Sequence, residues 1–295
     1  MTLRQLLNID PTNPKPLIAV PMTLGPSDKF GPFAQALDEQ NPDLVEWRAD
    51  YIVDAFSQDV IWQEVKAGAQ AEVQAKEVST LTQAKLMSEL DTARAEFLEN
   101  WPLMQVQIVK ELVANAFQTV NNRPLILTYR SKAQGGMGEL DEPAIASFLV
   151  TALKAGFHFA AVDLEDSMDE GLKAKVIEAA EKVKTPVILS YHDWQNTPKD
   201  LADIVKKMSQ EAVQVLKLAV MPENEKDVDF VLETCQQMNQ QVDQDLIMIA
   251  MGGLGERSRI EGYRYGSQLT FASLGKKYES ASGQLTVKDL LRAWS

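Results

Sequence analysis

Residues 213–220 read VQVLKLAV, an apolar run that carries one lysine, Lys217, near its end. A run of this length rich in Val and Leu predicts a strand, and apolar residues on both alternations predict a strand covered on both faces. A lysine is costly in such a place unless its ammonium has a partner, and a neutral, positioned amine can attack a ketone to form a Schiff base. Taken alone, the stretch favours the plainer interpretation, a lysine that reaches solvent from the strand end.

Seven further apolar runs and a series of amphipathic segments follow the same alternation. The apolar runs cover residues 17–22, 44–48, 125–130, 159–164, 186–191, 246–251 and 268–274. The amphipathic segments include residues 142–154, 171–184, 198–208, 225–238 and 286–294. Strands that alternate with helices predict parallel βαβ units. Eight such strands predict an α/β fold, a (β/α)8 TIM barrel in one domain over residues 1–295, and no Gly-rich phosphate motif follows the first strand to favour a dinucleotide-binding sheet.

One interval, residues 51–123, is far longer than the single helix that a barrel needs between its second and third strands. Residues 67–100 are rich in Ala, Glu, Gln, Lys and Leu, and Leu90 and Phe97 belong to an apolar set at helical spacing. This pattern predicts a helical insertion over roughly 55–105, with one or two extra helices, before the barrel's own helix near 102–120. A passive excursion, a lid and a dimer contact remain open as its role.

Composition narrows the class of partner. The 295 residues carry a formal net charge of -13, which argues against nucleic acid or an anionic membrane as the main partner. One cysteine, Cys235, excludes an internal disulfide, and with only two histidines a zinc site is not expected. The first ten residues lack the apolar core of a signal peptide, and no run of about 18 apolar residues could span a bilayer. We therefore expect a cytoplasmic protein.

The predicted strands end in polar and charged residues. In a barrel of this kind the carboxyl ends of the strands form the active-site rim. Single residues have plain explanations: Glu46 and Arg48 lie on one face of a strand as a structural ion pair would, and His192 could cap the next helix. Chance does not account for polar ends on six strands at one rim. The residues concerned are Glu46, Arg48, Arg130, Asp163, Glu165, His192, Lys217 and Arg259.

The chemistry available at such a rim is that of a Schiff-base enzyme. Lys217 supplies an amine, His192 a group that titrates near neutrality, and the arginines supply bidentate donors for a carboxylate. The sequence holds no metal-ligand cluster, nucleotide loop or Ser-His-Asp spacing. The set predicts an anionic keto-substrate that forms an iminium, loses an adjacent proton to His192 and then loses water.

Six ordered motifs resemble the type I 3-dehydroquinate dehydratases. They are EWRAD at 46–50, TYRSK at 128–132, SYHD at 190–193, LKLA at 216–219, MG at 251–252 followed by Ser258-Arg259, and SASGQ at 280–284. The resemblance covers nearly the whole chain except about residues 55–105. It implies a (β/α)8 barrel that forms a homodimer, needs no cofactor and converts 3-dehydroquinate to 3-dehydroshikimate by syn elimination in the shikimate pathway.

The resemblance also implies a role for each matching residue. Lys217 would be the Schiff-base lysine and His192 the general acid and base. The substrate pocket would be lined by Glu46, Arg48 and Arg130, the substrate carboxylate held by Arg259, and the pocket closed by Ser280 and Gln284. No metal is implied.

Two positions depart from the family pattern. Some members have a glutamate that orients the histidine, where this chain has Gln134, which can donate and accept hydrogen bonds but adds no charge to stabilise an imidazolium. Pro21 stands where some members have a serine that contacts substrate, so we predict no ligand there. Asp163 and Glu165 are expected to support the lysine or the histidine.

Two other functions remain as alternatives. Another Schiff-base barrel lyase, such as a class I aldolase, would also place a lysine on the sixth strand, although it explains the Arg259 and 280–284 pattern less well. A catalytically idle barrel that acts as a binding module would use the helical insertion as its surface. The intact lysine and histidine argue against this second alternative.

Overall fold

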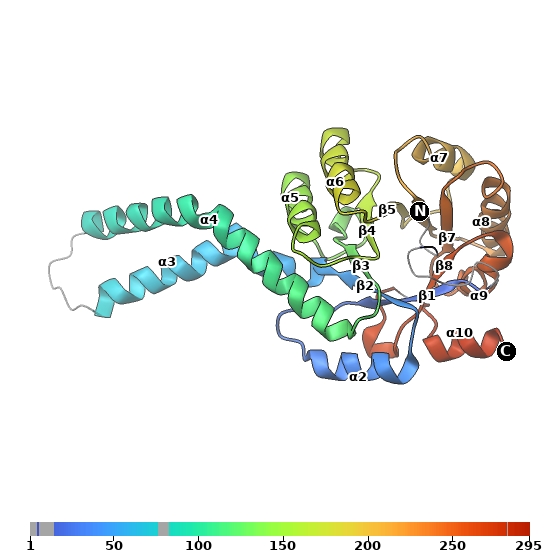
Figure 1. Ribbon diagram of the computed structural model, residues 1–295, viewed down its shortest axis with the longest axis horizontal. Coiled ribbons are helices and arrows are strands. Elements are labelled where there is room, and N and C mark those ends of the chain that lie inside the picture. The colour runs from blue at the N-terminus through green and yellow to red at the C-terminus, as the bar shows by residue number, and fades with distance from the viewer. Residues whose placement is uncertain (1–4, 6–14, 76–82, 282) are drawn as a thin grey trace.

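Eight parallel strands form one sheet that curls into a barrel in the computed structural model of the chain (Figure 1). The structure describes residues 5, 15–75, 83–281 and 283–295, so the expectation about the first ten residues lies almost wholly outside it. The strand order is β7-β6-β5-β4-β3-β2-β1-β8. The strands are β1 (Leu17–Met22), β2 (Leu44–Arg48), β3 (Leu125–Thr128), β4 (Ala161–Glu165), β5 (Val187–Asp193), β6 (Val215–Val220), β7 (Asp245–Ala250) and β8 (Leu269–Phe271).

The two edge strands of the sheet meet and bring the barrel close to full closure. Leu246 at the start of β7 pairs with Ser267, and the N–H of Gln268 donates to the Leu246 carbonyl at 2.8 Å. The predicted (β/α)8 barrel is confirmed, and the eight predicted apolar runs differ from the strands only by a few residues at their ends.

Helices surround the barrel. They are α2 (Phe30–Gln40), α5 (Glu142–Leu153), α6 (Glu170–Lys182), α7 (Leu201–Met208), α8 (Glu225–Met238), α9 (Glu256–Glu261) and α10 (Val287–Ala293). Short 3-10 helices lie at Ala49–Tyr51, Val53–Phe56, Lys132–Gln134, Gly262–Tyr265 and Lys276–Tyr278. Several helices begin at a side-chain cap, as at Asp141, Asp169 and Asn224, whose side-chain oxygens accept from backbone N–H groups of the first turn. The sequence analysis did not predict α2 and α9.

The inward side chains of the strands fill the barrel. On β6, Val215 belongs to the cluster that fills the barrel, whereas Leu216 and Leu218 belong to the larger core between strands and helices. All six residues of β6 are buried, which confirms a strand covered on both faces. By the same alternation, Lys217 projects inward one layer above Val215. The strand therefore delivers the lysine to the mouth of the barrel.

Two long helices leave the barrel between β2 and β3 as an arm (Figure 1). They are α3 (Gln58–Ala75) and α4 (Gln83–Val120), and residues 76–82 between them lie outside the described residues. The arm is held together where the Trp62 ring packs on Phe97 at 5.4 Å between centroids. The prediction of a separate barrel helix beginning near 102 is wrong, because Pro102 lies inside α4, whose second half is the barrel helix. Within the described part of the chain, no helix is both long and apolar enough to cross a membrane.

Candidate active site

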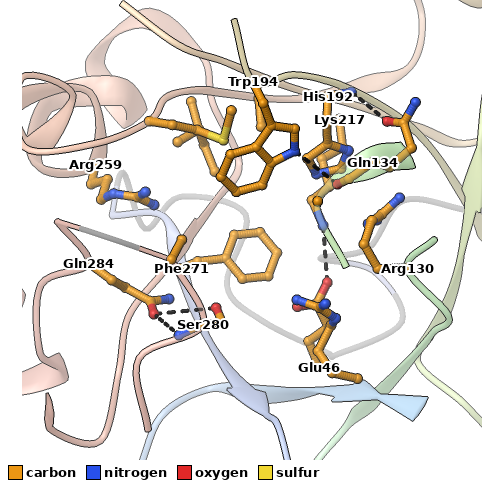
Figure 2. A pocket seen from close by; sticks show the side chains of 16 residues that line it. Glu46, Arg130, Gln134, His192, Trp194, Lys217, Arg259, Phe271, Ser280 and Gln284 are labelled. Carbon is orange, nitrogen blue, oxygen red and sulfur yellow. Dashed lines mark hydrogen bonds and ion pairs between the residues drawn. The ribbon is translucent and has the colours of Figure 1, made fainter. Parts of the chain in front are cut away.

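A pocket opens at the carboxyl ends of the strands, with an empty volume of about 570 Å³. The predicted catalytic and substrate-binding residues and the supporting Gln134 line it (Figure 2), whereas Asp163 and Glu165, also expected to support the site, are not among its lining residues. The predicted residues that line the pocket are Glu46, Arg48, Arg130, Gln134, His192, Lys217, Arg259, Ser280 and Gln284. Residues from six strands and their loops thus meet at one end of the barrel, as parallel strands require.

Lys217 points into this pocket and is only 5% exposed. Its Nζ lies 3.0 Å from Glu46 Oε1 and 3.0 Å from Asp163 Oδ2, and 4.5 Å from the centre of the Phe271 ring. The interpretation of a lysine that reaches solvent is therefore wrong, and the two carboxylates offset the cost of burying the ammonium. Glu46 also accepts a hydrogen bond from Thr128 Oγ1 at 3.2 Å.

Asp163 joins the lysine to an arginine. Arg130 contacts Asp163 Oδ1 at 2.6 Å and Glu165 Oε1 at 3.0 Å, while Ser190 Oγ donates to Asp163 at 2.7 Å. Burial alone would raise the pKa of Asp163, but Arg130 and Lys217 outweigh it and hold the pKa well below the usual range. Asp163 is thus a carboxylate in direct contact with the lysine, in agreement with the expectation that it supports the lysine or the histidine.

Arg48 is paired with a residue that the sequence analysis gave no role. Its Nε and Nη2 donate to the two oxygens of Asp50 at 2.8 Å and 2.7 Å, a bidentate arrangement. Asp50 also accepts from the backbone N–H of Met137 at 3.0 Å and so holds the loop after β3. Since Arg48 and Arg130 both have carboxylate partners within the chain, neither is a free cation for a substrate.

Arg259 is the exception among the pocket arginines. It is 4% exposed, forms no ion pair with any described residue, and its buried Nε has no hydrogen-bond partner among them. Burial lowers the pKa of Arg259 to about 10, so the side chain is still a cation near neutral pH. Figure 2 shows its guanidinium directed into the pocket. A buried, unpaired cation facing a cavity is a site for an anion.

The loop after β8 forms the wall beside Arg259. The backbone N–H of Ser280 donates to Gln284 Oε1 at 3.0 Å, which fixes the amide with its nitrogen available. Ile249, Met251 and Phe271 line the pocket between this wall and Lys217. The sequence analysis missed these three apolar residues, although the alternation along β7 places Ile249 and Met251 on one face.

His192 lies beside Lys217 with a polar atom unsatisfied (Figure 2). Its Nδ1 is buried and has no hydrogen-bond partner among the described residues. Burial, together with the positive charges of Arg130 and Lys217, lowers the pKa of His192 well below its ordinary value, although Asp163 opposes this. The imidazole is therefore neutral near pH 7 and can accept a proton.

Gln134 contacts His192 through the backbone rather than through the imidazole. Its Oε1 accepts from the His192 N–H at 2.9 Å, and its carbonyl accepts from Trp194 Nε1 at 3.0 Å. Trp194 was not predicted as a pocket residue. Gly135 has a φ of 78°, and a Cβ there would overlap the Trp194 indole, so the Gly135-Gly136 pair was the signal that something packs closely on this loop.

These positions bring together an inward amine, a neutral imidazole and an unpaired guanidinium. An amine can attack a ketone, a neutral imidazole can remove a proton from the carbon beside the resulting iminium, and a guanidinium can hold a carboxylate. Among the described residues, no group of three His, Cys, Asp or Glu side chains could hold a metal ion.

Sequence comparisons identify relatives that are named 3-dehydroquinate dehydratase. The chain is 32% identical over 204 residues to the 3-dehydroquinate dehydratase of Clostridioides difficile, a match that covers 67% of this chain and 76% of the relative. It is 31% identical over 214 residues to that of Lactococcus lactis subsp. cremoris, covering 72% of this chain and 90% of the relative.

Comparison with solved structures agrees with the sequence matches. The type I 3-dehydroquinate dehydratase from Clostridium difficile, solved with covalently modified comenic acid, superposes with a TM-score of 0.72 at 25% identity, over 95% of this chain and 90% of that one. The Enterococcus faecalis 3-dehydroquinate dehydratase shares the fold, with a TM-score of 0.68 at 22% identity, over 97% and 96% of the two chains. The model of the type I 3-dehydroquinase family matches residues 18–295. The chain therefore belongs to the type I 3-dehydroquinase family of hydro-lyases.

Proposed function

We propose that this enzyme removes water from 3-dehydroquinate to give 3-dehydroshikimate through a Schiff base on Lys217. The relatives carry this activity in their names, and the family model spans residues 18–295, which include every residue of the pocket. The observation that carries the mechanism is the inward Lys217 with His192 beside it in one pocket. The same relatives favour this reaction over the aldolase alternative and over an idle barrel.

The first step is attack of the Lys217 amine on the substrate ketone. Lys217 must first give up a proton, and two carboxylates are within reach, Glu46 and Asp163. Arg130 is bound to Asp163 and stabilises its charged form, whereas no arginine among the described residues lies within ion-pair distance of Glu46. Glu46 is therefore the better acceptor. Loss of water from the carbinolamine then gives the iminium.

The elimination follows from the electron demand of the iminium. Neutral His192 removes a proton from the adjacent carbon, and the electron pair moves toward the iminium nitrogen to form an enamine. The enamine expels the hydroxyl group, which leaves as water after His192 returns the proton. Hydrolysis of the remaining iminium releases the unsaturated ketone and restores the Lys217 amine, so one water is lost overall.

Arg259 is the residue proposed to hold the substrate carboxylate. It is the pocket arginine without a carboxylate partner, and Ser280 and Gln284 stand beside it. Arg48 and Arg130 line the same pocket and, in this proposal, act mainly by holding Asp50 and Asp163. Gln134 supports His192 by accepting a hydrogen bond from the backbone N–H of His192 at its Oε1 atom.

Three further expectations belong to this proposal. The enzyme uses no cofactor, since amine, imidazole and guanidinium together account for the chemistry. Its place would be the cytoplasmic shikimate pathway of aromatic amino acid biosynthesis. The homodimer implied by the resemblance is expected as well.

Borohydride reduction in the presence of 3-dehydroquinate tests the mechanism. We expect a stable adduct on the peptide that contains Lys217, detected by mass spectrometry. Lys173 is the matched internal control, because it is also buried and paired with a carboxylate, Glu211, at 2.9 Å, but it lies on α6 outside the pocket. An adduct on Lys173, or none on Lys217, would refute the Schiff base.

The His192→Ala variant separates imine formation from elimination. It should still give the Lys217 adduct, because the amine and its carboxylates are untouched. Release of 3-dehydroshikimate, followed by its absorbance, should be nearly abolished, since the proton shuttle contributes a factor of roughly 10²–10⁴ in many enzymes. Unchanged turnover would remove His192 from the acid–base role.

A further inference from the structure

One face of α4 carries charged and apolar side chains that are exposed to solvent. Glu99, Leu103, Val106 and Lys110 recur at spacings of four, three and four residues, which places them on one face of a helix. All four are exposed, and Leu103 and Val106 keep 75% and 38% of their surface in solvent. We call these four residues the α4 stripe.

The opposite face of α4 is already occupied. Leu90, Phe97 and Trp101 lie on it, and Phe97 packs between Trp62 of α3 and Trp101, with centroids 5.4 Å and 5.5 Å away. Further along, Leu112 is buried against the barrel. The stripe is therefore not the face that holds the arm together or attaches it to the barrel.

A single exposed leucine requires no partner, since folded proteins expose much apolar surface. The order of the stripe is more informative. It reads negative, apolar, apolar, positive, and neither Glu99 nor Lys110 forms an ion pair with a residue that the structure describes. When two copies of such a stripe run antiparallel, Glu99 faces Lys110 and Leu103 faces Val106, and the same contacts repeat on the other side of a two-fold axis.

Parallel pairing would instead place like charges together at both ends. Self-complementarity of this kind is what a two-fold, isologous interface needs, because each copy offers the same patch to the other. Burial of Leu103 and Val106 between two flanking ion pairs matches a helix contact with an apolar centre and a charged rim.

We propose that the α4 stripe is a homodimer contact, in which α4 packs antiparallel on α4 of a second copy about an axis between Leu103 and Val106. The contact spans about three helical turns, so it is smaller than the roughly 1,600 Å² of a standard interface and should give a concentration-dependent dimer. No described arm residue lines the active-site pocket, so the proposal does not depend on the catalytic mechanism.

The leucine at the centre of the stripe provides the first test. Sedimentation velocity over a range of concentrations should show a monomer–dimer equilibrium, and Leu103→Glu should raise the dissociation constant by at least about tenfold, since burying a leucine contributes about 1.5–3 kcal/mol. Leu291→Glu is the matched control, because Leu291 is 47% exposed on α10 away from α4. Far-UV circular dichroism checks that both variants keep their helices.

A charge exchange tests the antiparallel direction. Glu99→Lys and Lys110→Glu should each weaken the dimer, because each places like charges opposite one another, and the double variant should restore it by recreating both pairs. A wild type that stays monomeric at all concentrations would overturn the proposal. So would a dimer that Leu103→Glu leaves intact, or a double variant that remains as weak as the single ones.

Dehydratase activity gives a separate readout in all these variants. Each active site is built from a single chain, so turnover per chain should stay at the wild-type value when the dimer is weakened. Failure of the catalytic mechanism would appear in the borohydride experiment and would leave the sedimentation result unaffected.

Discussion

Lys217 and Lys173 show that burial by itself does not make a lysine a nucleophile. Both are about 5% exposed, and both have two carboxylates within 4 Å. Lys173 lies on a helix outside the barrel, whereas Lys217 faces a cavity that also holds His192 and Arg259. The difference is access to a substrate and to a proton acceptor, and both come from neighbouring strands.

Arg259 should separate substrate binding from stability. In the Arg259→Gln variant we expect kcat/KM to fall roughly 10- to 100-fold, because a hydrogen bond to a charged group is worth about 1.5–3 kcal/mol. The midpoint of thermal unfolding should stay the same or rise, because the variant removes a buried cation that has no carboxylate partner among the described residues. A large loss of stability with unchanged kinetics would contradict the assignment.

The protonation of His192 should determine how kcat declines at acid pH. Its pKa lies well below the ordinary value of about 6.5, so the neutral base persists as the pH falls, and kcat should decline only below that value. Gln134→Glu adds a negative charge beside His192, which favours the imidazolium and should move the acid limb to higher pH. Gln134→Leu, which removes the acceptor without adding charge, serves as the control and should give no upward shift.

At the scale of elements, the loop after β3 fits closely against the loop after β5. Gly135 has a positive φ, which favours glycine. A Cβ at this position would also overlap the Trp194 indole. Gly135→Ala should displace the indole and the carbonyl of Gln134, at a cost of about 1–3 kcal/mol in the free energy of unfolding and with a lower kcat. Gly253→Ala is the matched control, since nothing lies within 4 Å of its Cβ position. Equal effects of the two substitutions, measured by urea unfolding, would argue against this close fit.

At the scale of the whole molecule, the arm projects away from the barrel that holds the active-site pocket (Figure 1). A variant that replaces residues 66–93 with a short Gly-Ser turn keeps Trp62, Phe97 and the α4 stripe. Because no described arm residue lines the pocket, we expect KM and kcat to remain within about twofold of wild type. A strongly raised KM would indicate that the arm closes over the substrate. Loss of the dimer would indicate that the replaced residues, 66–93, also contribute to the dimer contact.

The sequence by itself determined the barrel fold and which residues lie at the rim of the barrel. Alternating apolar runs and amphipathic segments are local signals, because strand and helix periodicity need no knowledge of distant residues. The carboxyl ends of parallel strands must share one edge, so the sequence alone assigns Glu46, Lys217 and Arg259 to one pocket.

Only the tertiary structure decided which charges pair and which remain open. In the folded chain Arg48 forms an ion pair with Asp50 and Arg130 with Asp163, whereas Arg259 has no carboxylate partner among the described residues. The tertiary structure also continued α4 through Pro102, because the arm and the barrel fix the helix on both sides of a residue that locally disfavours it. Pairing and burial depend on distances between residues far apart in the chain, and composition and spacing do not carry that information.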